Sequence, residues 1–153
     1  MSQTSPTDTK TQRGADHGTL RIALECEIPS DPSFVNPLTV RTVKFLVDEG
    51  LVEPAVHEKV QLCLIEALRN AIVHGNRGDA SKKVQLRVFV DKGEWGFFIE
   101  DEGQGFDPKV ILYPADEETL WGSSGRGLPI MRHYMDRVEY FSGGSAVLLA
   151  RKR

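Results

Sequence analysis

The chain has 153 residues, of which 40% are apolar and 27% charged, and its formal net charge is −3 at neutral pH. This composition predicts one globular domain with a real core and excludes a disordered or collagen-like chain. There is no run of about 18 apolar residues, no secretory signal and no excess of positive charge, so we expect a cytoplasmic protein that contacts neither membrane nor nucleic acid.

Residues 1–18 are polar and predict a flexible tail, which leaves residues 19–153 as the domain. From Thr19 to Ile28 apolar and polar residues alternate, and this period of two predicts a half-buried strand. Apolar residues then recur at helical spacing over residues 37–49 and again over residues 54–75, which predicts two helices.

Two strands joined by a hairpin turn are expected next, over residues 84–90 and 94–100. A long aperiodic loop follows over residues 107–124. The chain then continues with a helix over residues 128–135 and two strands over residues 138–141 and 146–150. A loop of this length in a compact domain is usually functional or mobile. Because the strands bunch instead of alternating with helices, the expected fold class is α+β. We expect a two-layer sandwich whose mixed, mainly antiparallel sheet is covered by helices on one face.

Two cysteines, Cys26 and Cys63, form neither a CxxC pair nor a Cys/His cluster, so the sequence offers no zinc-ligand spacing. Cys26 falls on the apolar side of the first strand, and Cys63 falls in the second helix. Both are therefore expected to be buried free thiols in a reducing compartment.

Glu66, Asn70 and His74 recur every four residues in the second predicted helix and share one polar face beside its apolar stripe. A carboxylate can act as a general base and an amide oxygen can bind a hard cation, so this face suits a metal–nucleotide site. Taken alone, the same spacing also fits an ordinary solvated helix face. His74 also fits a histidine favoured by the dipole at a helix C-terminus.

Two glycine-rich runs follow. Asp101, Gly103 and Gly105 come directly after a predicted strand, where glycine lets a ligand approach the backbone and the carboxylate can accept hydrogen bonds from an amine. The run Gly125-Arg126-Gly127-Leu128 opens a helix, whose free N–H groups suit an anion. Each run alone also fits an acidic turn or a plain helix start, and neither matches a Walker A loop or a dinucleotide fingerprint.

In this order the three segments EALRNAIVHGN, DEGQGFDP and GRGLPIM resemble the N, G1 and G2 boxes of the GHKL, or histidine-kinase-like, ATPase superfamily. The resemblance covers about residues 19–150. Within the superfamily it is greatest to the stand-alone branch of anti-sigma-factor serine/threonine kinases and their relatives.

The resemblance implies ATP and Mg²⁺ as cofactors and a role for each matching residue. Glu66 would take the proton from the attacking hydroxyl, Asn70 would bind Mg²⁺ bridging the ATP phosphates, and Asp101 would bind the adenine amino group. His74 would reach the phosphates or the ribose, and residues 107–124 would form the mobile ATP lid. The residues implied to pack against the adenine and ribose or to close over the phosphates are Gly103, Gly105, Gly125, Arg126, Gly127 and Leu128.

The function that this resemblance implies is an anti-sigma factor that binds ATP and phosphorylates an anti-sigma-factor antagonist with a STAS-type domain. Two alternatives stay open: a non-catalytic, nucleotide-gated module that sequesters another regulator, and a simple ATPase subunit. A sensor histidine kinase needs a preceding helix pair, and the gyrase, chaperone and mismatch-repair branches need a following transducer domain. We expect neither here. Because relatives usually work as dimers, we also expect a homodimer that uses the strand Thr19–Ile28 and the following helix.

Overall fold

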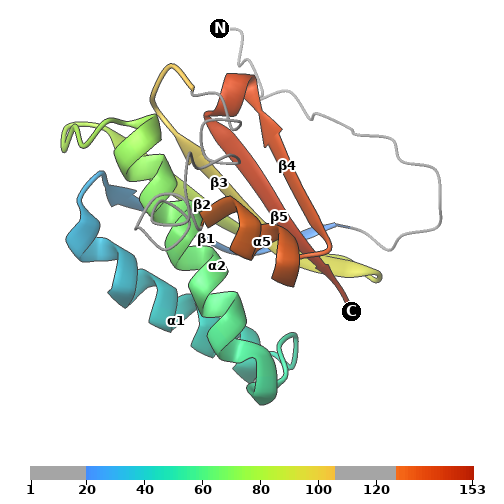
Figure 1. Ribbon diagram of the computed structural model, residues 1–153. Helices are drawn as coiled ribbons and strands as arrows, with labels where there is room; N and C mark the ends of the chain where they lie inside the picture. Colours follow the sequence, from blue (N-terminus) through green and yellow to red (C-terminus); the bar gives the residue numbers. More distant parts are fainter. Residues whose placement is uncertain (1–19, 106–126) are drawn as a thin grey trace, which may run out of the picture.

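The computed structural model describes residues 20–105 and 127–153. In this part of the chain a five-stranded sheet carries three α-helices together on one face (Figure 1). The strands are β1 (Arg21–Pro29), β2 (Lys83–Val90), β3 (Glu94–Asp101), β4 (Arg137–Phe141) and β5 (Ala146–Lys152). The α-helices are α1 (Val35–Asp48), α2 (His57–Asn70) and α5 (Gly127–Tyr134). Short helical turns are η1 (Pro32–Phe34), η2 (Pro54–Val56), η3 (Ala71–Gly75) and η4 (Ser142–Gly144).

The sheet has the strand order β1-β2-β3-β5-β4, and all four pairings among the described strands are antiparallel. The predicted α+β class with helices on one face is confirmed, while the described sheet is antiparallel throughout rather than mixed. The tail expected over residues 1–18 and the lid expected over residues 107–124 lie outside the described residues. None of the described helices combines the length and the apolarity needed to cross a membrane.

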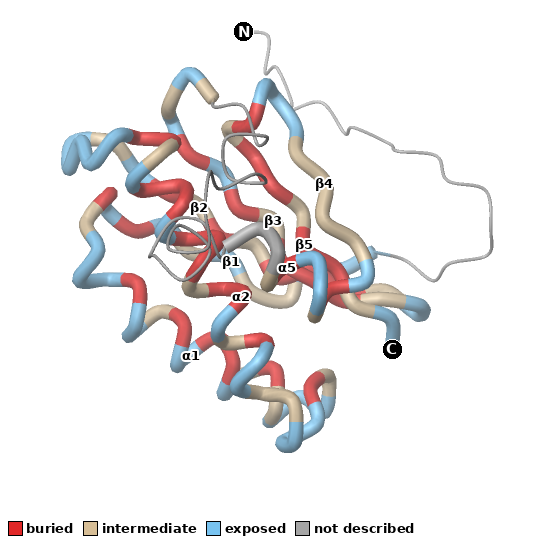
Figure 2. The backbone as a smooth tube through the Cα atoms, in the orientation of Figure 1, coloured by how far each residue is buried: buried red, intermediate tan, exposed pale blue. Residues whose placement is uncertain are grey.

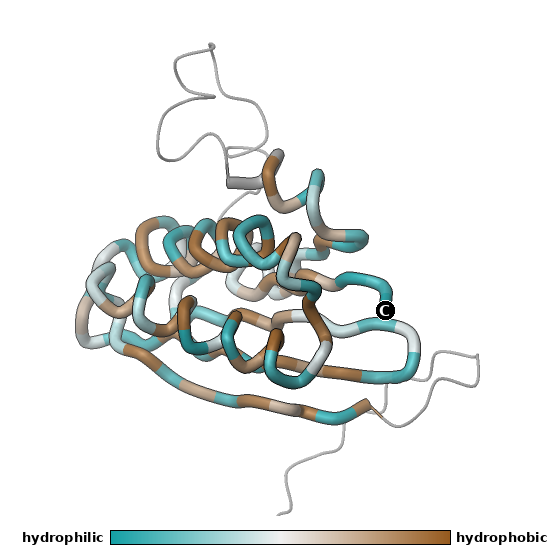
Figure 3. The backbone as a smooth tube through the Cα atoms, turned by 90° about the horizontal axis from the view of Figure 1, so that it is seen from below, coloured by the Kyte–Doolittle hydropathy of each residue, from teal (hydrophilic) through white to brown (hydrophobic). Residues whose placement is uncertain are grey.

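The hydrophobic core lies between the helices and the sheet, where buried segments of both layers face each other (Figure 2). The apolar stripe predicted for the second helix is confirmed. Its buried members are Val60, Cys63, Leu64, Ala67, Leu68, Ala71 and Ile72. Viewed from below, apolar and polar positions alternate around the helices, as expected for helices with one buried side (Figure 3).

Strand β1 carries a β-bulge between Ile22 and Leu24. Leu24 lies opposite Val88, a core residue of β2, whereas Ile22 lies opposite Phe89, on the alternate face of the same strand. An extra residue in a strand exchanges the faces of the side chains beyond it. Leu20 and Ile22 are therefore 59% and 48% exposed, and the single apolar face expected for this strand is wrong for its first residues.

Both cysteines are free thiols, as predicted, but they differ in burial. Cys63 is fully buried between α2 and α5, and burial raises the pKa of its thiol to about 12. Cys26 is only half-buried because β1 is the edge strand of the sheet. Burial, with the charge of Glu25 as a second cause, also raises the pKa of the Cys26 thiol.

Candidate ATP site

The helix that carries Glu66 and Asn70 changes its winding directly after Asn70. There α2 ends, and Ala71–Gly75 form a π-helical turn in which the Asn76 N–H donates to the Ala71 carbonyl oxygen over 2.8 Å. Such i→i+5 turns are wider than an α-helical turn and occur often at functional sites. Because His74 lies inside the wide turn, the regular four-residue spacing from Glu66 ends at Asn70.

Glu66 and Asn70 are buried, with exposed fractions of 8% and 6%. These values exclude the alternative of a solvated helix face for both residues. The Asn70 Nδ2 atom is buried and has no hydrogen-bond partner among the described residues. Leaving a buried amide donor unpaired is costly, so this side chain suits an acceptor that the described residues do not supply.

Helix α5 runs antiparallel to α2. Near its C-terminal end the Lys59 Nζ atom lies 5.3 Å from the centre of the Tyr134 ring, and one turn further on the Cys63 thiol donates to the Ile130 carbonyl oxygen over 3.8 Å. Continuing this pairing places Gly127, the first residue of α5, alongside Glu66, and Asn70 lies one turn of α2 beyond the start of α5. The N-terminus of α5 therefore lies nearer to Glu66 than to Asn70.

The start of this helix corresponds to the third sequence motif. Gly127 is the first residue of α5 and Leu128 is the second, which agrees with the predicted helix start to within one residue. Gly125 and Arg126 lie outside the described residues. An anion site at the start of α5, which the glycine-rich run predicts, stays a prediction.

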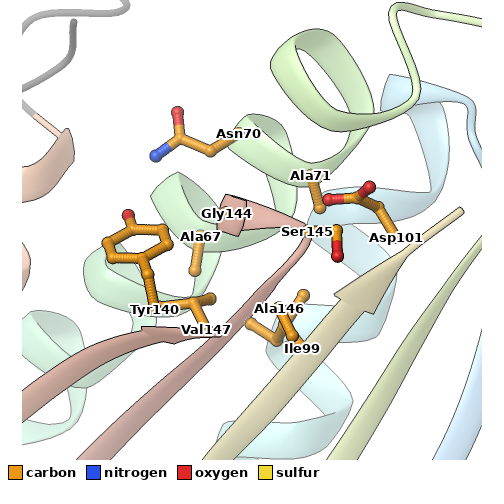
Figure 4. Close-up of a pocket in the computed structure, with 10 residues that line it drawn as sticks. All are labelled: Ala67, Asn70, Ala71, Ile99, Asp101, Tyr140, Gly144, Ser145, Ala146 and Val147. Atoms are coloured by element: carbon orange, nitrogen blue, oxygen red, sulfur yellow. The ribbon is translucent and has the colours of Figure 1, made fainter. Parts of the chain in front are cut away.

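A pocket of about 220 Å³, including the space that is open to solvent, lies between η3, α2, β3, β4 and β5 (Figure 4). Its lining residues are Ala67, Asn70, Ala71, Ile99, Asp101, Tyr140, Gly144, Ser145, Ala146 and Val147. Asn70 and Tyr140 lie on one side of the pocket, and Asp101 and Ser145 lie on the other. The part of this space that a water-sized sphere can occupy is only about 10 Å³, so a bound ring system requires the lining side chains to move apart.

Asp101 is the last residue of β3, lines the pocket and is 7% exposed. Burial raises the pKa of the Asp101 carboxyl, and the hydrogen bond from the Gly103 N–H, 2.8 Å from Oδ1, acts in the opposite direction. The Asp101 N–H donates to the Ser145 carbonyl oxygen over 2.9 Å, which ties β3 to the start of β5. The carboxylate is therefore fixed in place and poorly hydrated, as an acceptor for a polar ligand group must be.

The glycines after Asp101 serve close packing of the backbone. A β-carbon on Gly103 would overlap the carbonyl group of Gly75, and one on Gly105 would overlap the carbonyl group of Gly143. Gly105 also has φ of +83°, a conformation that favours glycine. The close approach of a ligand to these glycines stays a prediction, and the structure shows that the glycines also let the segment after β3 pack against η3 and η4.

The model of the family described as histidine kinase-like ATPase domain matches residues 28–151. The chain belongs to this family. The predicted membership of the histidine-kinase-like superfamily is thereby confirmed, and the family implies that the domain binds a nucleotide.

Several relatives of this histidine-kinase-like domain are named anti-sigma F factor. The protein of Halalkalibacterium halodurans is 31% identical over 96 residues, which cover 59% of this chain and 64% of the relative. The protein of Clostridium perfringens is 28% identical over 109 residues, which cover 65% of this chain and 76% of the relative. The protein of Bacillus thuringiensis is 31% identical over 99 residues, which cover 61% of this chain and 66% of the relative. The chain thus spans less than two thirds of the length of the first and third relatives. The names agree with the branch that the sequence resembles.

The residues of the histidine-kinase-like domain fit a metal that is held mainly by a ligand's phosphates. No group of three or more His, Cys, Asp or Glu side chains in the described part of the chain could hold a metal ion by itself. Mg²⁺, however, is commonly bound by one or two protein groups, with phosphates and water completing its shell. The amide oxygen of Asn70 at the pocket wall can be such a group, whereas its buried and unpaired Nδ2 atom is a donor and suits an acceptor such as a phosphate oxygen.

Sequence reasoning missed three residues of this region: Asn76, Ser145 and Tyr140. Asn76 is 1% exposed, and its amide donates to the Lys83 carbonyl oxygen over 3.0 Å and accepts from the Glu102 N–H over 2.8 Å. It ties the π-turn to β2 and to the end of β3. Its place directly after the glycine that closes the helix was the available signal. Ser145 and Tyr140 line the pocket from strands that are distant in the sequence, so no local pattern marks them.

Proposed function

We propose that this histidine-kinase-like domain is an ATP-dependent serine/threonine protein kinase that also binds a sigma factor and phosphorylates an anti-sigma-factor antagonist. The observation that carries the proposal is the position of buried Asn70 and buried Asp101 on opposite sides of one pocket. Relatives that are named anti-sigma F factor support the anti-sigma part.

In this proposal the adenine ring occupies the pocket. Asp101 accepts a hydrogen bond from the adenine amino group, and the apolar side chains of Ala67, Ile99 and Val147 enclose the ring. Since the Asp101 carboxylate is largely removed from water, its hydrogen bond to a ligand competes with little solvent. This arrangement favours an amino group over a carbonyl at the same position and hence adenine over guanine.

The phosphates then extend toward Asn70 and the first turn of α5. Asn70 supplies an oxygen to Mg²⁺, which would neutralise charge on the phosphates, and the run Gly125-Arg126-Gly127-Leu128 supplies N–H groups. His74, half-buried in the π-turn, is proposed to reach the ribose or the phosphates. Residues 107–124 are proposed to cover the bound nucleotide as a lid.

Glu66 is the proposed catalytic base. It lies one helical turn before Asn70 on the same face of α2, so it is close to the end of the phosphate chain. As the serine or threonine oxygen of the protein substrate bonds to the terminal phosphorus, the bond from that phosphorus to the ADP oxygen breaks. The hydroxyl proton passes to the Glu66 carboxylate. Positioning and charge stabilisation supply most of the catalysis in such transfers.

A cytoplasmic homodimer completes the proposal. Leu20 and Ile22 place two neighbouring exposed apolar side chains at the edge strand of the sheet, and this is the surface proposed to meet the second protomer. The proposed protein partners are a sigma factor and a STAS-type antagonist.

The proposed function is tested by an affinity pull-down from the native cell with and without Mg·ATP, read by mass spectrometry that includes phosphosites. We expect a sigma factor together with a STAS-type protein phosphorylated on serine or threonine. Glu66→Gln should recover the same partners without new phosphate, whereas Arg69→Gln, an exposed residue of the same helical turn, should behave as the wild type. Partners recovered without phosphorylation would instead favour a nucleotide-gated binding module.

A further inference from the structure

Among the described residues, the pocket wall contains one aromatic residue, Tyr140 of β4, which contributes to the pocket from the edge of the sheet. Tyr140 lies opposite Val147, a buried core residue of β5, so its side chain is on the helix-facing side of the sheet. Its hydroxyl oxygen is buried. Burial raises the pKa of Tyr140 to about 12, which keeps the hydroxyl protonated and able to donate at neutral pH.

The position of Tyr140 in the pocket indicates which part of a ligand it contacts. Tyr140 and Asn70 lie on one side, and Asp101 lies on the other (Figure 4). A nucleotide whose base is held at Asp101 and whose phosphates reach Asn70 passes its sugar–phosphate part beside Tyr140. The positive charge of Arg132 on α5 acts on the Tyr140 hydroxyl and opposes the effect of burial on its pKa.

We propose that the Tyr140 hydroxyl donates a hydrogen bond to an oxygen of the sugar–phosphate part of the bound nucleotide, an inference that rests on the proposed function. Tyr140 is then a ligand-binding residue and not only part of the core. Phenylalanine would fill nearly the same volume, so Tyr140→Phe changes the hydroxyl and little else. A donor inside the pocket gains strength from the low local dielectric and from the charge of a phosphate oxygen.

The test compares wild-type protein with Tyr140→Phe in competition against a fluorescent ADP analogue, using adenine, adenosine and ADP as competitors. Removal of one hydrogen bond to a charged oxygen should weaken ADP binding by roughly tenfold or more, while adenine binding stays unchanged. The result for adenosine separates the two sources of the oxygen. If adenosine is weakened as much as ADP, the oxygen belongs to the ribose; if adenosine is unaffected, it belongs to a phosphate.

Tyr134→Phe is the matched control, because Tyr134 lies on α5 against Lys59 and outside the pocket, and it should bind all three competitors as the wild type does. A purely structural role of Tyr140 would lower the melting temperature and weaken adenine and ADP by the same factor. That result, or unchanged ADP binding, would overturn the inference. Failure of the wild-type protein to bind ADP at all would instead overturn the proposed function.

Discussion

Gly75 lies in direct contact with the Asp101 carboxylate, and a β-carbon at residue 75 would overlap its oxygen atoms. The two residues come from different layers, since Gly75 closes the π-turn after α2 and Asp101 ends β3. The absence of a side chain at residue 75 therefore allows the helix layer to approach the sheet at this point and fixes the carboxylate at the edge of the pocket.

This contact predicts that Gly75→Ala disrupts nucleotide binding. The added methyl group must displace the Asp101 carboxylate or the π-turn, and overpacking of this kind costs about 1–3 kcal/mol of stability. Because Asp101 moves, we also expect ATP affinity to fall by roughly tenfold. Isothermal titration with ATP and urea unfolding measure the two effects.

Gly78→Ala is the control for this variant. Gly78 has φ of +70°, but a β-carbon there would meet no atom within 4 Å. The substitution should cost about 1–2 kcal/mol through backbone strain alone and leave ATP affinity unchanged. Equal losses of ATP affinity in the two variants would contradict a specific role for the contact between Gly75 and Asp101.

Asp101→Asn should separate binding from stability. The amide presents donors where adenine needs an acceptor, so we expect weaker ATP binding and a smaller preference for ATP over GTP.

The same variant has a second expected effect, on stability. Burial raises the pKa of the Asp101 carboxyl, so this group keeps its proton to a higher pH in the folded protein than in the unfolded chain. Wild-type stability therefore falls as the pH rises from 3.8 through the raised pKa. The Asp101→Asn amide does not titrate, so the variant does not lose stability in this way and should be at least as stable as the wild type at pH 7. Near pH 3.5, where the wild-type carboxyl is protonated, the difference in stability should be smaller. Thermal unfolding at both pH values tests this.

Asn70→Ala should remove the dependence of nucleotide affinity on Mg²⁺. In the wild type, ATP should bind more tightly with Mg²⁺ than with EDTA, and in the variant the two dissociation constants should converge. Asn76→Ala is a contrasting variant, because Asn76 joins the π-turn to Lys83 and Glu102. It should lose roughly 1–3 kcal/mol of stability while the ratio of the two dissociation constants persists. A Mg²⁺ dependence that survives in Asn70→Ala would refute the proposed role.

The elements that local sequence patterns predicted correctly are those whose signal lies within the element itself. The apolar spacing of α2 and the alternation of β2 and β3 are examples, because the period alone decides which side is buried. The π-turn was missed because Ala71 and Ile72 continue the helical apolar spacing. The end of the π-turn is held by hydrogen bonds of the Asn76 side chain with Lys83 and Glu102, which lie further along the chain.

Local sequence patterns do not predict features that depend on the pairing of strands or on contacts between several elements. Nothing in the alternation around Ile22 reveals the bulge, because the bulge is defined by the register with Phe89 of β2. The candidate site was predicted for Asp101 and Asn70, whose motifs are local. Tyr140 was missed because the pocket brings it to them from the far edge of the sheet.

The two thiols should differ in reactivity. Only a thiolate reacts readily with iodoacetamide, and burial raises the pKa of Cys63 to about 12, so Cys63 should remain unmodified in the native protein at pH 8. Cys26 is half-buried and should react slowly under the same conditions. Peptide mapping after native and denatured labelling tests this order. Modification of Cys63 at the rate of Cys26 would show that α5 separates from α2 in solution.

Ile22→Glu should weaken the proposed dimer. The β-bulge turns Ile22 away from the core and leaves it 48% exposed, so a charge there costs little in the folded monomer but would be buried at an interface formed by the edge strand. Sedimentation equilibrium should show a shift from dimer to monomer with little change in melting temperature. Leu62→Glu is the matched control, because Leu62 is 39% exposed on α2, in the other layer. Dissociation by Leu62→Glu but not by Ile22→Glu would place the interface on the helices and away from β1.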